Sequence, residues 1–239
     1  MLKLYKITII FFLFLILITN LLSFDSVKNI IRPYFKLELQ VDTNSTTYDN
    51  QNISYYPSKE IIELLQEGGN TIFIRHSHKK HSEFQRAFDV VELNQYESKY
   101  IKENNCLTSR GREEAKFIGL IFEHLKIPLD NVYTSPICRC VETAKIAFEK
   151  YQIKEFLQYE YTVEKKNRAG FKDKTYKLFF DKPKNNYNKI IVAHGSTPFS
   201  LGFNFPKIGQ SGLMIYNHNN DKISAILEFD SFVHALYKK

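Results

Sequence analysis

The sequence predicts an α/β domain, in which helices pack on a sheet whose strands alternate with them along the chain. Three short apolar runs, residues 71–74, 132–134 and 190–193, are rich in β-branched or aromatic side chains, as buried strands are. Stretches with apolar residues at helical spacing separate these runs, and the chain has no internal repeats. Such alternation is typical of a layered α/β fold. With 239 residues, 44% of them hydrophobic, the chain is long enough for one such domain with appendages.

Residues 1–24 have the layout of a signal peptide or an N-terminal membrane anchor. Lys3 and Lys6 precede an apolar run over residues 7–22, which is slightly short for a transmembrane helix of about 20 residues. The run ends in Leu-Leu-Ser-Phe without a small-x-small cleavage pair, so both cleavage and retention as an anchor stay open. In either case the rest of the chain is expected outside the cytoplasm, in the periplasm or secreted.

Residues 25–56 are polar and lack steady periodicity, which predicts a solvated linker. The folded domain is therefore expected over residues 57–239. It should open with a helix that Ser58 caps and that Gly68 ends. After the first strand, residues 78–105 show no clean period and predict a long loop beside the strand ends, with one helix over 89–101.

The next helix is expected to begin at Thr108 or Ser109, with apolar residues at helical spacing facing the sheet. The strand at 132–134 leads into Ser135 and Pro136, which predict an N-cap followed by a proline in the first helical turn. The remaining expected elements are an edge strand around 156–159, a helix over 174–180, the strand 190–193, a helix start at Ser196, and a hairpin of strands 213–216 and 223–229.

The formal net charge of +7 and the pI near 9.1 suit an anionic substrate or partner. The basic residues are spread along the chain without a dense run that interleaves with aromatic side chains. Nucleic acid is therefore not an expected partner.

Cys106, Cys138 and Cys140 are the only cysteines, and export would permit a disulfide. Pairing of Cys106 with Cys138 and pairing with Cys140 are both open, as is a chain with three reduced thiols. The absence of a Cys-x-x-Cys pair argues against a zinc site.

Reactive polar side chains follow all three predicted strands, at the edge where open α/β sheets bind ligands. Arg75 and His76 end the first strand, Arg139 follows the second, and His194 follows the third. A neutral imidazole is a nucleophile toward phosphorus and forms a phosphohistidine that water can discharge. Arginine binds two phosphoryl oxygens at once, and a helix N-terminus adds backbone donors. Convergence of the strand ends would therefore build a phosphoryl-transfer site.

Four motifs lie in this order along the chain: Phe73-Ile-Arg-His76, Leu107-Thr-Ser-Arg-Gly-Arg-Glu-Glu-Ala115, Tyr133-Thr-Ser-Pro-Ile-Cys-Arg139 with Glu142-Thr-Ala144, and Val192-Ala-His-Gly195. Together they resemble the histidine phosphatase (phosphoglycerate mutase-like) superfamily over about residues 71–229. The small-branch phosphatases fit better than the acid phosphatase and phytase branch. The segment between the second arginine and the second histidine is shorter here, and glycine rather than an acidic residue follows that histidine.

The resemblance implies a three-layer α/β/α sandwich around a mostly parallel mixed sheet. It also implies an exported phosphomonoester hydrolase that acts on a small phosphorylated substrate without a metal or other cofactor. His76 would be the phosphorylated nucleophile, and Arg75, Arg139 and His194 would form the phosphate pocket, with His194 also catalytic.

Two departures from the family pattern bear on the chemistry. Ser77 stands where the family usually has glycine, so the turn after His76 can differ. The general acid is not apparent; Glu164 is the preferred choice, with Glu160 and Asp173 as alternatives. Without such an acid, hydrolysis would be limited to substrates with good leaving groups.

Two other functions compete with this interpretation. His76, His78 and His81 have spacings seen in metal sites and would make a metallohydrolase. Neighbouring cations, among them Lys79 and Lys80, disfavour a metal there. The second alternative is an exported protein that binds a phosphate ligand without catalysis.

Overall fold

The structure is a computed structural model, which describes residues 53–80, 105–159, 162–204 and 207–234. The chain divides into two units, Met1–Thr47 and Tyr48–Lys239, and all described residues lie in the second. The expected leader, most of the expected linker and the helix expected over 89–101 lie outside the described residues. Within the described part of the chain, no helix is long and apolar enough to cross a membrane.

A sheet with the strand order β3-β2-β4-β1-β5-β6 forms the centre of the described unit. Its parallel part joins β3, β2, β4 and β1, whereas β5 and β6 are antiparallel additions beside β1. The strands are β1 (Asn70–Arg75), β2 (Leu129–Thr134), β3 (Gln152–Ile153), β4 (Asn188–Ala193), β5 (Leu213–Asn217) and β6 (Lys222–Leu227). The isolated bridge between Ser54 and Ala225 adds the start of the described chain to β6.

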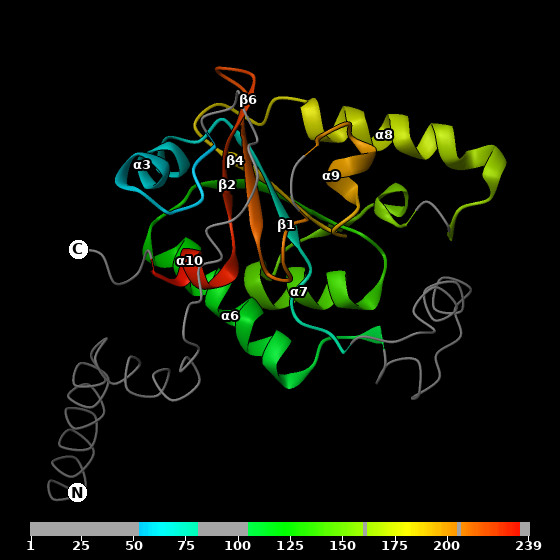
Figure 1. The fold of residues 1–239 in the computed structure, drawn as a ribbon, viewed down its shortest axis with the longest axis horizontal. Coiled ribbons are helices and arrows are strands. Elements are labelled where there is room, and N and C mark those ends of the chain that lie inside the picture. The colour runs from blue at the N-terminus through cyan, green and yellow to red at the C-terminus, as the bar shows by residue number, and fades with distance from the viewer. Residues whose placement is uncertain (1–52, 81–104, 160–161, 205–206, 235–239) are drawn as a thin grey trace, which may run out of the picture. The chain divides into compact units, whose positions relative to one another are not determined.

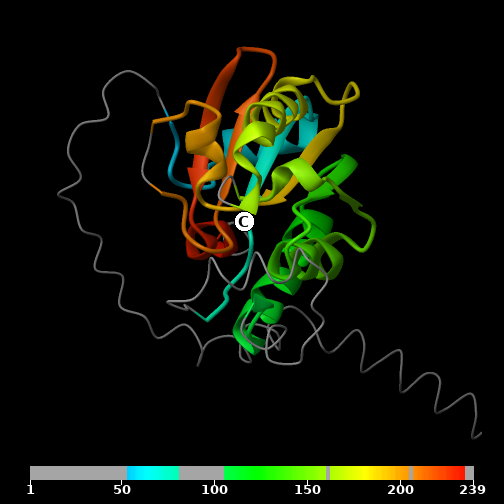
Figure 2. The ribbon, with the colours of Figure 1, turned by 90° about the vertical axis from the view of Figure 1, so that its right-hand side faces the viewer.

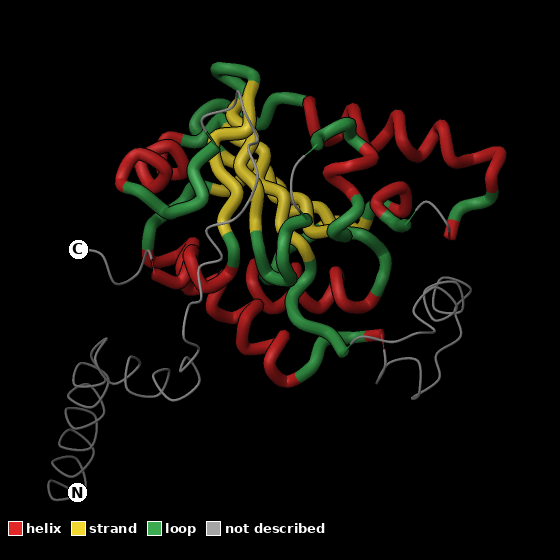
Figure 3. The backbone as a smooth tube through the Cα atoms, in the orientation of Figure 1, coloured by secondary structure: helices red, strands yellow, loops and turns green. Residues whose placement is uncertain are grey.

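Helices cover both faces of the sheet and make a three-layer α/β/α sandwich, as predicted (Figures 1 and 3). One face carries α3 (Lys59–Glu67), α6 (Ser109–His124), α7 (Cys138–Phe148) and α10 (Phe229–His234). The other face carries the 3₁₀ helices η2 (Glu155–Leu157) and η4 (Lys165–Asn167), with α8 (Arg168–Phe180) and α9 (Thr197–Ser200). In Figure 2, α8 lies in front of the strands.

Alternating strand residues feed two separate apolar clusters. On β1, Ile72 and Ile74 pack on the side of α6 and α7, whereas Phe73 packs with Phe179 of α8. β1 and β4 are buried on both faces, which explains why their sequences are continuous apolar runs rather than alternating ones.

The predicted helix starts at Ser58 and Thr108 are confirmed. The Ser58 hydroxyl accepts the N–H of Ile61, and the Thr108 hydroxyl accepts the N–H of Gly111 at 3.1 Å. Each cap lies directly before its helix, α3 and α6, so local sequence chemistry sets both starts.

The helix start predicted at Ser135 is wrong. The N-cap of α7 is Ile137, and the helix begins at Cys138. The Ser135 hydroxyl lies 2.9 Å from the Nε2 atom of His194. The same hydroxyl accepts the N–H of Ile137 at 3.4 Å, so it serves a turn before the helix and a long-range partner rather than the cap of α7.

The edge strand predicted around residues 156–159 is also wrong. The edge strand is β3, paired with Tyr133 and Thr134, and the apolar residues after it form η2. Leu157 is buried in the cluster beneath α8, so its apolar character reflects tertiary packing. Elsewhere α8 begins at Arg168, before the expected residue 174, and the last strand ends at Leu227, before α10.

Close packing of α6 against α7 depends on Gly119, and we predict that Gly119→Ala destabilises the fold. A Cβ there would lie 2.4 Å from the Ala147 carbonyl oxygen of α7, so the helices must move apart. Overpacking of this kind costs about 1–3 kcal/mol in the free energy of unfolding, measurable by urea denaturation.

Gly170 of α8 is the matched control, because a Cβ there meets nothing within 4 Å. Gly170→Ala should leave stability unchanged or raise it by up to about 1 kcal/mol, since glycine is a poor helix former. Equal effects of the two substitutions would contradict the role given to Gly119.

Candidate functional site

The strand ends converge as the sequence predicts. β1 and β4 are adjacent and parallel with Arg75 opposite Ala193, so the next residues, His76 and His194, lie side by side. Their ring centroids are 5.8 Å apart. β2 pairs with β4 on the other side and leads into α7, whose first turn carries Arg139. The Arg139 Nη2 atom lies 3.4 Å from His194 Nδ1.

His76 is buried and presents a defined nitrogen for chemistry. Its Nδ1 lies 2.9 Å from the Ser77 carbonyl oxygen, which can only accept, so Nδ1 carries the proton and Nε2 holds the lone pair. Burial and then the charge of Arg139 hold the pKa of His76 well below its usual value, against the opposing effect of the Ser77 hydrogen bond. His76 is therefore neutral at pH 7, the form in which an imidazole can act as a nucleophile.

His194 has the opposite tautomer. A guanidinium only donates, so His194 Nδ1 accepts from Arg139, and His194 Nε2–H donates to the Ser135 hydroxyl. Burial, followed by the charge of Arg139 and the neighbouring His76, holds the pKa of His194 well below its usual value. The two imidazoles are thus neutral and present different nitrogen atoms to their surroundings.

Two arginines supply positive charge at these histidines. Arg139 is 1% exposed, and its Nη1 donates to Asn105 Oδ1 at 2.8 Å. Arg75 Nη1 donates to the Ile208 carbonyl at 2.8 Å, while its buried Nε has no hydrogen-bond partner among the described residues. A Cβ at Gly195 would lie 3.1 Å from both Arg75 Nε and Lys207 Cε, so glycine leaves room for both cations. The site can therefore hold and neutralise an oxyanion such as a phosphoryl group.

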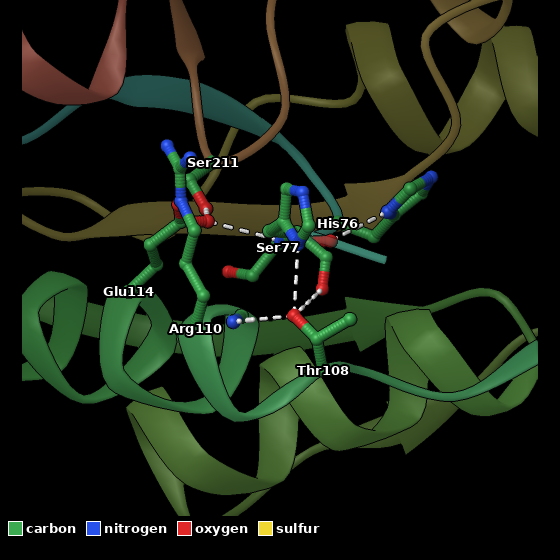
Figure 4. A network of polar contacts seen from close by, with 8 residues as sticks. His76, Ser77, Thr108, Arg110, Glu114 and Ser211 are labelled. Atoms are coloured by element: carbon green, nitrogen blue, oxygen red, sulfur yellow. Dashed lines mark hydrogen bonds and ion pairs between the residues drawn. The ribbon is translucent and has the colours of Figure 1, made fainter. Parts of the chain in front are cut away.

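The loop after His76 rests on the N-terminal turn of α6 (Figure 4). Thr108 Oγ1 lies 2.8 Å from His78 Nδ1 and 3.2 Å from the His78 carbonyl oxygen. A Cβ at Gly111 would lie 2.0 Å from that carbonyl, so only glycine permits this approach. The Thr and Gly of the second motif are thus explained by contact with His78, two residues after His76.

Glu114 supports the same loop from below (Figure 4). Its buried carboxylate accepts from the His78 N–H at 3.0 Å, from the Ser211 hydroxyl at 2.7 Å and from Arg110 Nε at 2.7 Å. Charge-assisted bonds of this kind fix backbone position. Glu114 is therefore a positioning residue that the sequence analysis did not single out.

Thr143 gives the physical reason for the Glu-Thr-Ala motif. Its Oγ1 accepts from the Ser77 N–H at 2.9 Å and donates to the Arg139 carbonyl at 2.7 Å. One hydroxyl therefore couples the residue after His76 to the helical turn that carries Arg139.

A disulfide between Cys106 and Cys138 fixes that turn covalently, which is one of the two pairings left open by the sequence. It joins the residue after Asn105 to the residue before Arg139 and so brackets the hydrogen bond between them. Cys140 is a buried free thiol whose Sγ lies 3.8 Å from both ring nitrogens of His194.

Other predicted residues are not brought to the site by the described structure. The Glu164 side chain is 68% exposed and pairs with Lys166 at 2.9 Å, and Asp173 lies on the exposed part of α8. Glu160 and His81 lie outside the described residues. The assignment of Glu164 as general acid therefore stays a prediction without a supporting contact.

The described residues bring together no group of metal ligands that includes His76 or His78. The one cluster with suitable spacing in that part of the chain is Cys106, Cys138 and Glu142, whose two cysteines form the disulfide. His78 faces Thr108, as described above. The geometry thus gives no support to the metallohydrolase alternative.

Tyr159 is the principal site residue that the sequence analysis missed. Its ring stacks on His194 with centroids 3.9 Å apart and an interplanar angle of 26°, and Arg139 Cζ lies 5.6 Å from its centroid. The expected strand in this region placed no side chain at the site. Asn105 and Lys207 were missed too, since each lies in a stretch without periodicity.

Comparison with known proteins agrees with the geometry. Residues 72–161 match the family model of the histidine phosphatase superfamily (branch 1). No curated protein matches the sequence significantly.

Similar solved structures include phosphoserine phosphatase from Entamoeba histolytica, with 15% identity and a TM-score of 0.36 over 64% of this chain and 93% of that one. They also include a putative phosphohistidine phosphatase SixA from Agrobacterium tumefaciens, with 15% identity and a TM-score of 0.43 over 66% of this chain and 97% of that one. A mycobacterial glucosyl-3-phosphoglycerate phosphatase has 12% identity and a TM-score of 0.43 over 66% of this chain and 96% of that one.

We predict that acid destabilises the protein through the two buried histidines. Unfolded histidine titrates near pH 6.5. Because both folded-state pKa values are lower, the unfolded chain binds protons first, and stability is lost as pH falls below about 6.5. Each histidine contributes a slope of up to about 1.4 kcal/mol per pH unit, measurable by urea denaturation between pH 7.5 and 5.

His194→Asn should flatten that slope relative to the unmodified protein. His218, whose pKa burial and then Lys189 and Lys182 lower to about 4, contributes in the same direction and remains in both proteins. An unchanged slope in the variant would show that the pKa of His194 is the same in the folded and unfolded states, which would contradict the prediction.

We also predict that Cys106→Ser/Cys138→Ser weakens both stability and anion binding. Opening a loop of 32 residues costs about 3–4 kcal/mol in unfolding free energy on the chain-entropy model. Freed from the bridge, Asn105 would hold Arg139 less firmly, so vanadate affinity should fall in a titration. A reductant should lower stability and vanadate affinity in the parent protein and should change neither in the double variant. If the reductant also lowered stability or affinity in the double variant, the role given to the disulfide would be contradicted.

Proposed function

We propose that this chain, whose residues 72–161 match the histidine phosphatase superfamily model, hydrolyses phosphomonoesters through a phosphohistidine on His76, without a metal. The observation that carries the proposal is the state of His76. Because Nδ1–H donates to the Ser77 carbonyl, Nε2 carries the lone pair. Burial beside Arg139 lowers the pKa of His76 and keeps the ring neutral. A nucleophile needs both features to attack phosphorus at neutral pH.

The residues of the site divide the reaction between them. The His76 Nε2 lone pair attacks phosphorus, a P–N bond forms, and the P–O bond to the leaving group breaks. Arg75 and Arg139 bind the equatorial oxygens, whose negative charge is present in both steps. Water then attacks the phosphohistidine, releasing phosphate and the neutral imidazole. His194 orients the Arg139 fork through its Nδ1 and forms part of the pocket wall beside His76.

We further propose that this domain works outside the cytoplasm. The sequence supports this through the leader-like residues 1–24, and the disulfide Cys106–Cys138 fits an oxidising compartment. In such a compartment the bridge beside Arg139 would persist without enzymatic maintenance.

The test is an assay of the full chain, purified in detergent, on p-nitrophenyl phosphate with EDTA and with vanadate. We expect activity that survives EDTA and is inhibited by vanadate. His76→Ala should lower kcat by about 10³-fold or more, as removal of a covalent nucleophile does. Arg139→Ala should lower kcat and weaken vanadate binding, and Arg139→Lys should recover little, because lysine lacks the fork.

His124→Ala, at the end of α6, is the control histidine and should leave activity unchanged. Full activity in His76→Ala would refute the phosphohistidine mechanism. Loss of activity on chelation would support the metallohydrolase alternative. Tight vanadate binding without turnover would support a protein that binds a phosphate ligand without catalysis.

A further inference from the structure

Tyr159 is built into the site rather than resting on its rim. Its ring stacks on His194, with centroids 3.9 Å apart, and lies under the Arg139 guanidinium. The chain reaches this position from η2, whose Leu157 is buried in the same cluster as Phe179 of α8. The tyrosine itself is half-buried.

The described residues place no carboxylate in contact with the two imidazoles, and Glu160 lies outside the described residues. Among the described residues, no carboxylate is hydrogen-bonded to His76 or His194, and the Glu164 side chain faces solvent beside Lys166. Both imidazoles are neutral with their N–H groups engaged by Ser77 and Ser135. A leaving alkoxide nevertheless needs a proton when the P–O bond breaks.

We infer that Tyr159 is a catalytic residue, whose phenol hydroxyl donates that proton to the leaving group; the inference rests on the proposed phosphatase function. As the P–O bond breaks, its electron pair goes to the leaving oxygen, which takes the Tyr159 proton. The tyrosinate then accepts a proton from the water that attacks the phosphohistidine. The phenol is restored, and no further reactant is needed.

The cations of the site favour this role. Arg139 lies over the ring, and the interaction between Arg75 and Tyr159 is favourable when both are charged, so a transient phenolate is stabilised where it forms. A phenol also stays protonated through the pH range in which a carboxylic acid would ionise. The acid form of the catalyst is therefore available at neutral pH without the burial that a glutamic acid would need.

The test compares leaving groups in the full chain, with Tyr159→Phe as the main variant. On p-nitrophenyl phosphate, whose leaving group needs little protonation, the variant should keep kcat/KM within about twofold. On glycerol phosphate, an alkyl ester, kcat/KM should fall about 10²-fold or more. Vanadate affinity should not change, because the phenyl ring keeps the stack on His194.

Tyr176→Phe is the matched control, since Tyr176 is exposed on α8 and packs on Phe180. It should leave both substrates unaffected. Tyr159→Ala removes the stack as well as the hydroxyl and should lower activity on both esters.

Three outcomes would overturn the inference. One is an equal effect of Tyr159→Phe on the two esters, which would reduce Tyr159 to packing. Another is no effect on either. The third is a leaving-group-dependent loss in Glu160→Gln or Glu164→Gln but not in Tyr159→Phe, which would assign the proton to a carboxylate. Failure of the phosphohistidine mechanism itself would be recognised separately, by full activity of His76→Ala on p-nitrophenyl phosphate.

Discussion

A buried guanidinium beside two buried imidazoles is the constraint on which the site depends. Arg139 is 1% exposed, and it lies where the helix dipole of α7 is also positive. Protonation of His76 or His194 would add a second positive charge in a medium that screens poorly. Both histidines therefore stay neutral, and the arginines carry the positive charge of this cluster. The same arrangement provides the neutral imidazole and the positive charge that the proposed mechanism requires.

The rest of the described fold can be understood as support for that cluster. The pairing of β1 with β4 sets the distance between the histidines, and β2 with α7 delivers the arginine. Thr143 and Glu114 then accept hydrogen bonds from the backbone N–H groups of Ser77 and His78, the two residues directly after His76. Each contact comes from a single side chain, and together they fix the backbone of these two residues. Pre-organisation of this kind is how a site binds charge without rearranging during the reaction.

Most of this architecture could be predicted from the sequence because its causes are local. Strands buried on both faces read as apolar runs, Ser58 and Thr108 read as caps, and strand ends in α/β sheets carry ligand-binding residues. The errors have long-range causes. The Ser135 hydroxyl is taken by His194, 59 residues later, and Leu157 is apolar because it meets α8. Tyr159 reaches the site only through that packing, so no local pattern indicates its role.

Ser77 illustrates how a departure from a family pattern can be tolerated. Its φ is not among the positive values of the described non-glycine residues, so the backbone there does not require glycine. Its N–H is bound by Thr143, which keeps the turn after His76 in place. The added side chain is fully buried, and its hydroxyl has no hydrogen-bond partner among the described residues. A buried hydroxyl next to the nucleophile is stable at low cost only when a polar group can reach it. Serine at this position thus adds a buried hydroxyl beside His76 without requiring a backbone conformation that only glycine adopts.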